Sequence, residues 1–160
     1  MKQAIFIIGL LAFISCKDKN QQETSTQNTN SEATHQHHQN ETSTVYQNSW
    51  TADMQLNNGG KWPANIETNE GVENMKNILK TQPTITIEDY HQLAAQLNDA
   101  KNDVVKKCTM EGPSHDYLHV WLVPLIEKIE VLSETKNSED AAKIKSSIVE
   151  NINMYSNYFQ

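Results

Sequence analysis

The spacing of apolar side chains after residue 44 predicts a chain that is helical throughout. In four long segments, apolar residues recur three and four positions apart, which places them on one face of an α-helix. These segments lie near Ile66–Lys80, Ile87–Cys108, His115–Ser133 and Glu139–Tyr158. No segment alternates apolar and polar residues for long enough to predict a sheet. Because short loops between amphipathic helices favour antiparallel neighbours, the pattern predicts an all-α, up-down-up-down four-helix bundle.

The apolar face of each segment is the predicted core of this bundle. A stripe of this kind is buried when helices pack side by side. In chain order the four stripes consist of Ile66, Val72, Met75, Ile78 and Leu79; of Tyr90, Leu93, Ala94, Leu97, Val104, Val105 and Cys108; of Leu118, Trp121, Leu122, Leu125, Ile129 and Leu132; and of Ala141, Ile144, Ile148, Ile152, Tyr155 and Phe159.

A short extra helix is predicted before the bundle. Trp50, Met54 and Leu56 can line one face of a helix that begins near Ser49 and ends at Asn58-Gly59-Gly60. Asparagine and glycine at this point are typical of a helix end. We expect the helix to pack on the bundle.

Capping and breaking residues predict where the long helices begin and end. Asn65 and Thr86 are the expected N-caps of the first and second helices. Gly112-Pro113 is expected to stop the second helix, and Ser114 to cap the third. Pro124 lies inside the third helix, where proline removes a hydrogen bond and predicts a kink or a break.

The start of the chain resembles a bacterial lipoprotein signal. An apolar run from Ala4 to Ile14 has the length of a signal peptide and is too short to span a bilayer. It is followed by Ser15 and Cys16, and in such signals the cysteine is lipidated and becomes the first mature residue. Lys17 after the cysteine favours the outer membrane. The alternative is an ordinary secretory signal with an incidental cysteine.

Three regions follow from these patterns. Residues 1–15 are the expected signal peptide, residues 16–44 the lipidated cysteine and a disordered polar tether, and residues 45–160 the helical bundle. The tether has almost no apolar side chains, so it cannot offset the entropy of ordering. A flexible coil of this length spans on the order of 30 Å. Its histidines, in His35-Gln36-His37-His38, either bind metal loosely or belong to a plain polar linker.

Charge and cysteine content narrow the function further. The 160-residue chain has a net charge of −7, a pI near 5.3 and no arginine. Affinity for nucleic acid comes mostly from neutralised phosphates, often through arginine, so we expect no nucleic-acid binding. Two cysteines cannot build a disulfide framework. The composition therefore favours a small acidic domain.

Side chains that can bind a metal ion are concentrated between the predicted second and third helices. Cys108 ends one apolar stripe, so its sulfur is expected to point toward the core at the end of the bundle. His115 and His119 are four residues apart and share a helix face. A tight turn should bring them, together with Met110, to the same end. Thiolate, thioether and imidazole suit copper best, and one cysteine with two histidines also suits zinc.

The same residues have an ordinary structural explanation. Cysteine is among the most often buried residue types, and a histidine in a first helical turn can simply hydrogen-bond near the helix end. Met110 can be a turn residue that packs on Trp121. Asp116 is expected either to interact favourably with the helix dipole or to hydrogen-bond a ligand histidine.

Two stretches of the sequence resemble a family of small bacterial envelope lipoproteins. The first is Cys108-Thr109-Met110-x-Gly112-x-x-His115-Asp116-x-Leu118-His119-x-Trp121-Leu122-x-Pro124, and the second is Leu56-Asn57-Asn58-Gly59-x-Lys61-Trp62-x-x-Asn65. The resemblance covers the chain from about Trp50 to Leu132. The family has no established activity, so the resemblance implies an envelope lipoprotein and not a reaction.

Two functions remain open, and neither is catalytic. The chain has no dinucleotide-binding, Walker A, nucleophile-elbow or c-type haem motif, and we expect no enzyme. The first hypothesis is copper or zinc binding in the envelope. The second is a protein that binds no metal and docks another envelope component, which the sequence does not identify. Exposed Trp50 or Trp62 would favour docking, whereas sulfur and imidazoles within coordination reach would favour a metal.

Overall fold

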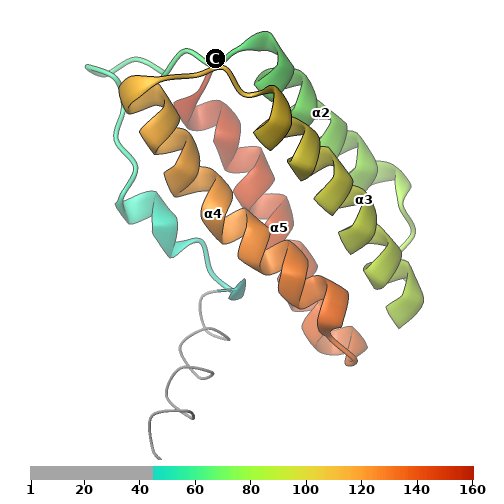
Figure 1. The fold of residues 1–160 in the computed structure, drawn as a ribbon. Helices are drawn as coiled ribbons and strands as arrows, with labels where there is room; N and C mark the ends of the chain where they lie inside the picture. The colour runs from blue at the N-terminus through green and yellow to red at the C-terminus, as the bar shows by residue number, and fades with distance from the viewer. Residues whose placement is uncertain (1–44) are drawn as a thin grey trace, which may run out of the picture. The chain divides into compact units, whose positions relative to one another are not determined.

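Four long helices joined by short connections form an antiparallel bundle. The structure is a computed structural model that describes residues 45–160, and the expectations for residues 1–44 lie outside this range. The helices are α2 (Ile66–Thr81), α3 (Ile87–Lys107), α4 (Gly112–Glu134) and α5 (Ser138–Tyr158), shown in Figure 1. Each helix packs against the next, and α2 also packs against α5, which closes the bundle. The predicted all-α four-helix bundle is confirmed. None of the helices within residues 45–160 is long and apolar enough to cross a membrane.

The short extra helix is a single 3-10 turn, η1 (Ser49–Ala52), which packs on α4. Trp50 and Met54 are buried as predicted, but Leu56 is 46% exposed and the prediction for it is wrong. The chain leaves the helix after Ala52, so Leu56 no longer follows a helical face. It then turns back at Asn58 and Gly59, whose positive φ angles of 51° and 86° fit a tight two-residue turn.

Most of the predicted core is buried, and the exceptions lie at the helix ends. Val105 is 54% exposed, because Val104 before it already occupies the core-facing position and the next residue is turned about 100° around the helix. Ile66 is 71% exposed. The buried position in the first turn of α2 belongs instead to Thr68, whose hydroxyl hydrogen-bonds Asn65 Oδ1 at 2.6 Å.

The helix ends confirm one predicted cap and correct others. Thr86 caps α3 as expected: its hydroxyl accepts from the Asp89 amide at 3.2 Å, and its own amide donates to the Asp89 carboxylate. Gly112 and Pro113 do not stop a helix but form the first turn of α4, where the missing amide of proline costs nothing. Ser114 therefore lies inside the helix rather than capping it. The helix also runs unbroken through Pro124.

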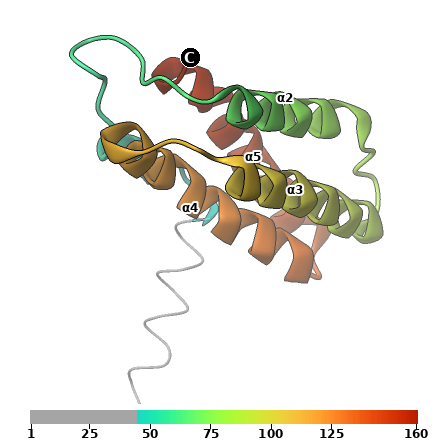
Figure 2. The ribbon, with the colours of Figure 1, turned by 45° about the horizontal axis from the view of Figure 1, so that its top comes forward.

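One end of the bundle is tied together by backbone hydrogen bonds. The Trp62 amide donates to the Tyr158 carbonyl at 2.7 Å, and the Gln160 amide donates to the Trp62 carbonyl at 3.0 Å. The Ala64 amide donates to the Gln160 carbonyl at 2.9 Å. This end holds the starts of α2 and α4 and the ends of α3 and α5, as Figures 1 and 2 show.

The segment before η1 is fastened to the bundle through a buried lysine. Lys128 of α4 is only 1% exposed, and its ammonium donates to Asn48 Oδ1. The same oxygen accepts from Trp50 Nε1, while Asn48 Nδ2 donates to the Ser147 carbonyl and to Glu150. Burial lowers the pKa of Lys128 to about 8, although the charge of Glu150 opposes the shift.

A close approach of α2 and α3 generates a first prediction. A Cβ placed on Gly71 would lie 2.3 Å from Cγ2 of Val104, a buried side chain that is stiff in a helix. Gly71→Ala gains helix propensity, but the overlap forces the helices apart, and we expect a net loss of about 1–3 kcal/mol in the free energy of unfolding. Urea denaturation measures this loss. Val104→Ala in the Gly71→Ala background should recover part of it, and a stabilised Gly71→Ala protein would contradict the packing described.

The buried lysine generates a second prediction, on pH. Between pH 8 and 10.5 the unfolded lysine is protonated and the folded one is neutral, so the unfolded state binds more protons and stability from this residue rises with pH. Lys128→Met should therefore be more stable than the wild type at pH 7, with an advantage that shrinks toward pH 10. Denaturation at both pH values tests this. The exposed Lys136→Met is the control, and an advantage of Lys128→Met that does not depend on pH would contradict it.

Candidate functional site

The predicted metal-binding residues lie together where α3 ends and α4 begins. Cys108 directly follows α3, and its amide donates to the Val104 carbonyl at 3.0 Å. Its side chain is half-buried and packs against the core, as does that of Met110 in the connection. His115 and His119 lie on the first two turns of α4, the former half-buried and the latter exposed.

Three of these side chains form a chain with His115 in the middle. Cys108 Sγ lies 3.6 Å from His115 Nδ1, and His115 Nε2 lies 3.0 Å from His119 Nε2. The two imidazole rings meet edge to face, with centroids 4.6 Å apart. The thiol and both imidazoles are thus brought to one place, as the spacing predicts. Asp116 is exposed and forms no hydrogen bond to either histidine within residues 45–160.

When His115 is neutral, the protons of the Cys–His–His contacts can be arranged in two ways. If His115 carries its proton on Nδ1, it donates to the sulfur and accepts from His119; with the proton on Nε2, it accepts from the thiol and donates to His119. Either way one Nε2 must be an unprotonated acceptor. The contact between the histidines is therefore lost when both imidazoles are protonated.

The two distances are close to those between neighbouring ligands of a metal ion. Around a tetrahedral zinc ion, a sulfur and a nitrogen ligand lie about 3.6 Å apart, and two nitrogen ligands about 3.3 Å apart. His115 offers a different nitrogen to each neighbour, however, so neither of its nitrogens faces both Cys108 and His119. Accordingly, residues 45–160 contain no group of three or more His, Cys, Asp or Glu side chains set to hold a metal ion. Turning the His115 ring is the change that a shared ion requires.

Aromatic residues pack beside the Cys–His–His chain. Trp62 stacks on Tyr117 of α4 at a centroid distance of 4.9 Å, and Trp62 Nε1 donates to the Gln55 carbonyl. On α5, Tyr155 donates its hydroxyl to Asn69 Oδ1 at 2.9 Å. Burial, and to a smaller extent the charge of Cys108, raises the pKa of Tyr155, so its phenol stays protonated at neutral pH.

Sequence spacing did not reveal a residue that links α2 to this site. Asn65 Nδ2 donates to the carbonyl of Lys107, the residue before Cys108, at 3.0 Å. The two residues are 42 positions apart, and helical periodicity says nothing about contacts over that distance. The sequence contained one indication of this contact: the stretch that ends at Asn65 and the stretch that contains the site residues resemble the same family.

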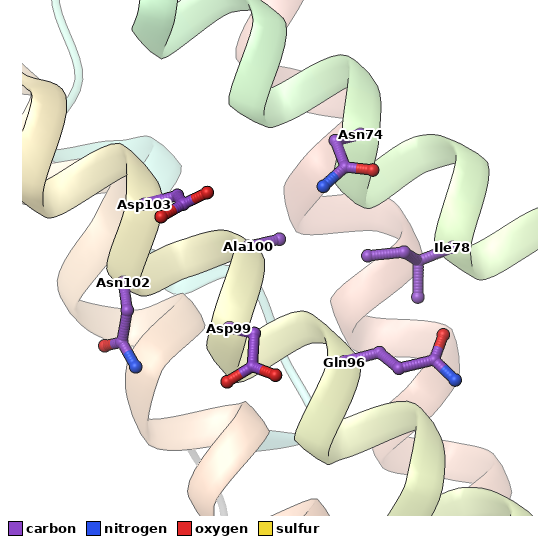
Figure 3. Close-up of a pocket in the computed structure, with 7 residues that line it drawn as sticks. All are labelled: Asn74, Ile78, Gln96, Asp99, Ala100, Asn102 and Asp103. Atoms are coloured by element: carbon purple, nitrogen blue, oxygen red, sulfur yellow. The ribbon is translucent and has the colours of Figure 1, made fainter.

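The groove between α2 and α3 is lined by none of these residues. The groove in Figure 3 has a volume of about 470 Å³ and runs between α2 and α3. Asn74 and Ile78 line it from α2, and Asp99 and Asp103 are among the residues that line it from α3. Its lining contains no cysteine, histidine or methionine. It offers none of the soft ligands found at the Cys–His–His chain.

Comparison of the chain with protein-family models, with curated proteins and with solved structures found no match in any of the three.

Proposed function

We propose that this protein is a lipoprotein of the bacterial envelope whose bundle binds copper or, less favourably, zinc through Cys108, His115 and His119. The observation that carries the proposal is the pair of contacts, 3.6 Å from sulfur to imidazole and 3.0 Å between imidazoles. One thiol and two imidazoles form a ligand set that both metals accept. Met110, in the connection beside them, is the proposed weak fourth ligand.

Metal binding requires only a small rearrangement. One imidazole nitrogen of His115 has to face the ion together with the sulfur and the His119 nitrogen. An off-rotamer side chain costs about 0.5–1.5 kcal/mol, whereas zinc binding to a structural site contributes about 10–16 kcal/mol. The rearrangement is therefore no obstacle. Thiolate and thioether are soft ligands, which favours copper over zinc.

The lone thiol supports a metal over a disulfide. The sequence has two cysteines, and in the proposal Cys16 carries the lipid anchor. Cys108, which is free in the structure, then has no partner within its own chain in an oxidising compartment. A metal ion would occupy and protect it. Residues 17–44 would hold the bundle away from the outer membrane, where it would buffer, sense or deliver the ion.

Two other functions receive less support from the geometry. Docking through an exposed tryptophan is disfavoured, because Trp50 is buried and Trp62 is half-buried under its stack with Tyr117. A thiol beside an imidazole also occurs at cysteine nucleophiles, in which a carboxylate or amide orients the base. Here a second imidazole takes that position, which favours metal ligation.

The direct test is metal titration of the full-length protein in detergent. We expect one Cu(I) per chain in competition with a chromophoric chelator, and a Cys108→Ser variant that binds at least about 100-fold more weakly, since loss of even an outer partner costs 10–100-fold. His91→Gln is the matched control, because His91 bonds the Thr135 carbonyl and not this site. A second control replaces all three tether histidines. Equal affinity of wild type and Cys108→Ser would overturn the proposal.

The affinity should also depend on pH. Binding requires neutral imidazoles and a thiolate, so protons compete with the metal. We therefore expect the affinity to be clearly weaker at about pH 5.5 than at about pH 7.5. The same competition assay at the two pH values measures the fall. Affinity that is constant over this range would exclude the histidines as ligands.

A further inference from the structure

We infer that Asn65 is a positioning residue that fixes the peptide bond before Cys108 and thereby aims the sulfur at His115. The metal part of this inference rests on the proposed function, whereas the positioning itself rests on hydrogen bonds alone. Asn65 stands at the N-cap position of α2, yet its side chain caps none of the amides of that helix. Its amide group is used at the end of α3 instead.

The peptide between Lys107 and Cys108 is held on both sides. Lys107 is the last residue of α3, and the carbonyl groups at a helix end have no partner in their own helix. Asn65 Nδ2 donates to this carbonyl at 3.0 Å. The amide of the same peptide belongs to Cys108 and donates to the Val104 carbonyl at 3.0 Å. Because both polar groups are hydrogen-bonded, the orientation of the peptide plane between Lys107 and Cys108 is fixed. The Cys108 side chain can then move only by rotation about its own bonds.

The orientation of the Asn65 side chain is itself determined by its neighbours. Nδ2 also donates to the Glu67 carboxylate at 2.7 Å, and both of its partners can only accept. On the other side, Oδ1 accepts from the hydroxyl of Thr68, a fully buried residue. A flipped amide would set its oxygen against two acceptors. Asn65 therefore holds the end of α3 in a single orientation.

The short segment that contains Asn65 contacts both halves of the site. Three residues before it, Trp62 stacks on Tyr117, which lies between His115 and His119 on α4. Asn65 bonds the peptide that carries Cys108. The segment contacts the end of α3, which precedes Cys108, and the start of α4, which carries both histidines. It therefore positions the thiol relative to the imidazoles.

The informative variant is Asn65→Asp. Aspartate is a good N-cap and still accepts from Thr68, so α2 keeps its start. It has no donor for the Lys107 carbonyl or for the Glu67 carboxylate, but Glu67 is exposed and can turn to solvent, whereas the Lys107 carbonyl cannot. We expect Cu(I) affinity of the full-length protein to fall about tenfold, the loss typical of an outer partner. In the Cys108→Ser background the same change should have no effect on residual affinity. Asn74→Ala, on the exposed face of α2, is the control that should change neither.

A second measurement needs no metal. The rate at which iodoacetamide alkylates Cys108, followed on its peptide by mass spectrometry, should rise at least about threefold in Asn65→Asp and stay unchanged in Asn74→Ala, because the half-buried thiol loses its fixed place. If the wild type binds no metal but this rate rises, the proposed function fails and the positioning stands. If metal binds and Asn65→Asp alters neither affinity nor alkylation, the inference is overturned.

Discussion

A circuit of aromatic residues, closed by one backbone bridge, holds the end of the bundle at which the site lies. Trp121 of α4 is fully buried and meets Tyr155 of α5 edge to face, with ring centroids 4.9 Å apart. Tyr155 stacks on Phe159, which a backbone bridge joins to Trp62. Trp62 returns to α4 by stacking on Tyr117, one turn before Trp121. Large aromatic surfaces contribute strongly to packing energy, so this circuit fixes the ends of α4 and α5 and the segment before α2 together.

The Cys–His–His chain lies at the rim of this rigid frame. His115 and His119 alternate along α4 with Tyr117 and Trp121, so the same two turns carry both the imidazoles and their support. Burial decreases from Cys108 and His115 to His119, which is exposed. In the proposed metal site, a cysteine ligand on a fixed backbone and a histidine ligand open to solvent would allow the ion to exchange.

The sequence predicted the helices because their cause is local. The stripes that contain Leu93 and Ile148 repeat with a period that no other structure satisfies, and both are fully buried. Errors arose where position in the bundle decides the outcome. Gly112 and Pro113 could end one helix or start the next, and the sequence does not say where the connection between the two helices lies. The exposure of Val105 depends on Val104, which already takes the core-facing position. The grouping of Cys108 with the histidines could be predicted because these residues are close in the sequence. The contact from Asn65 to Lys107 spans 42 residues and depends on how α2 and α3 pack against each other.

The bond between Asn48 and Lys128 decides where the folded unit begins. An ammonium ion inside a helical bundle needs a partner, and that partner lies outside the four helices, 80 residues earlier in the chain. Removal of residues up to Asn48 by a protease would strand the charge and withdraw Trp50 from its place on the bundle. Cleavage a few residues earlier would leave the contact intact. A cut that leaves this contact intact therefore has to lie before Asn48.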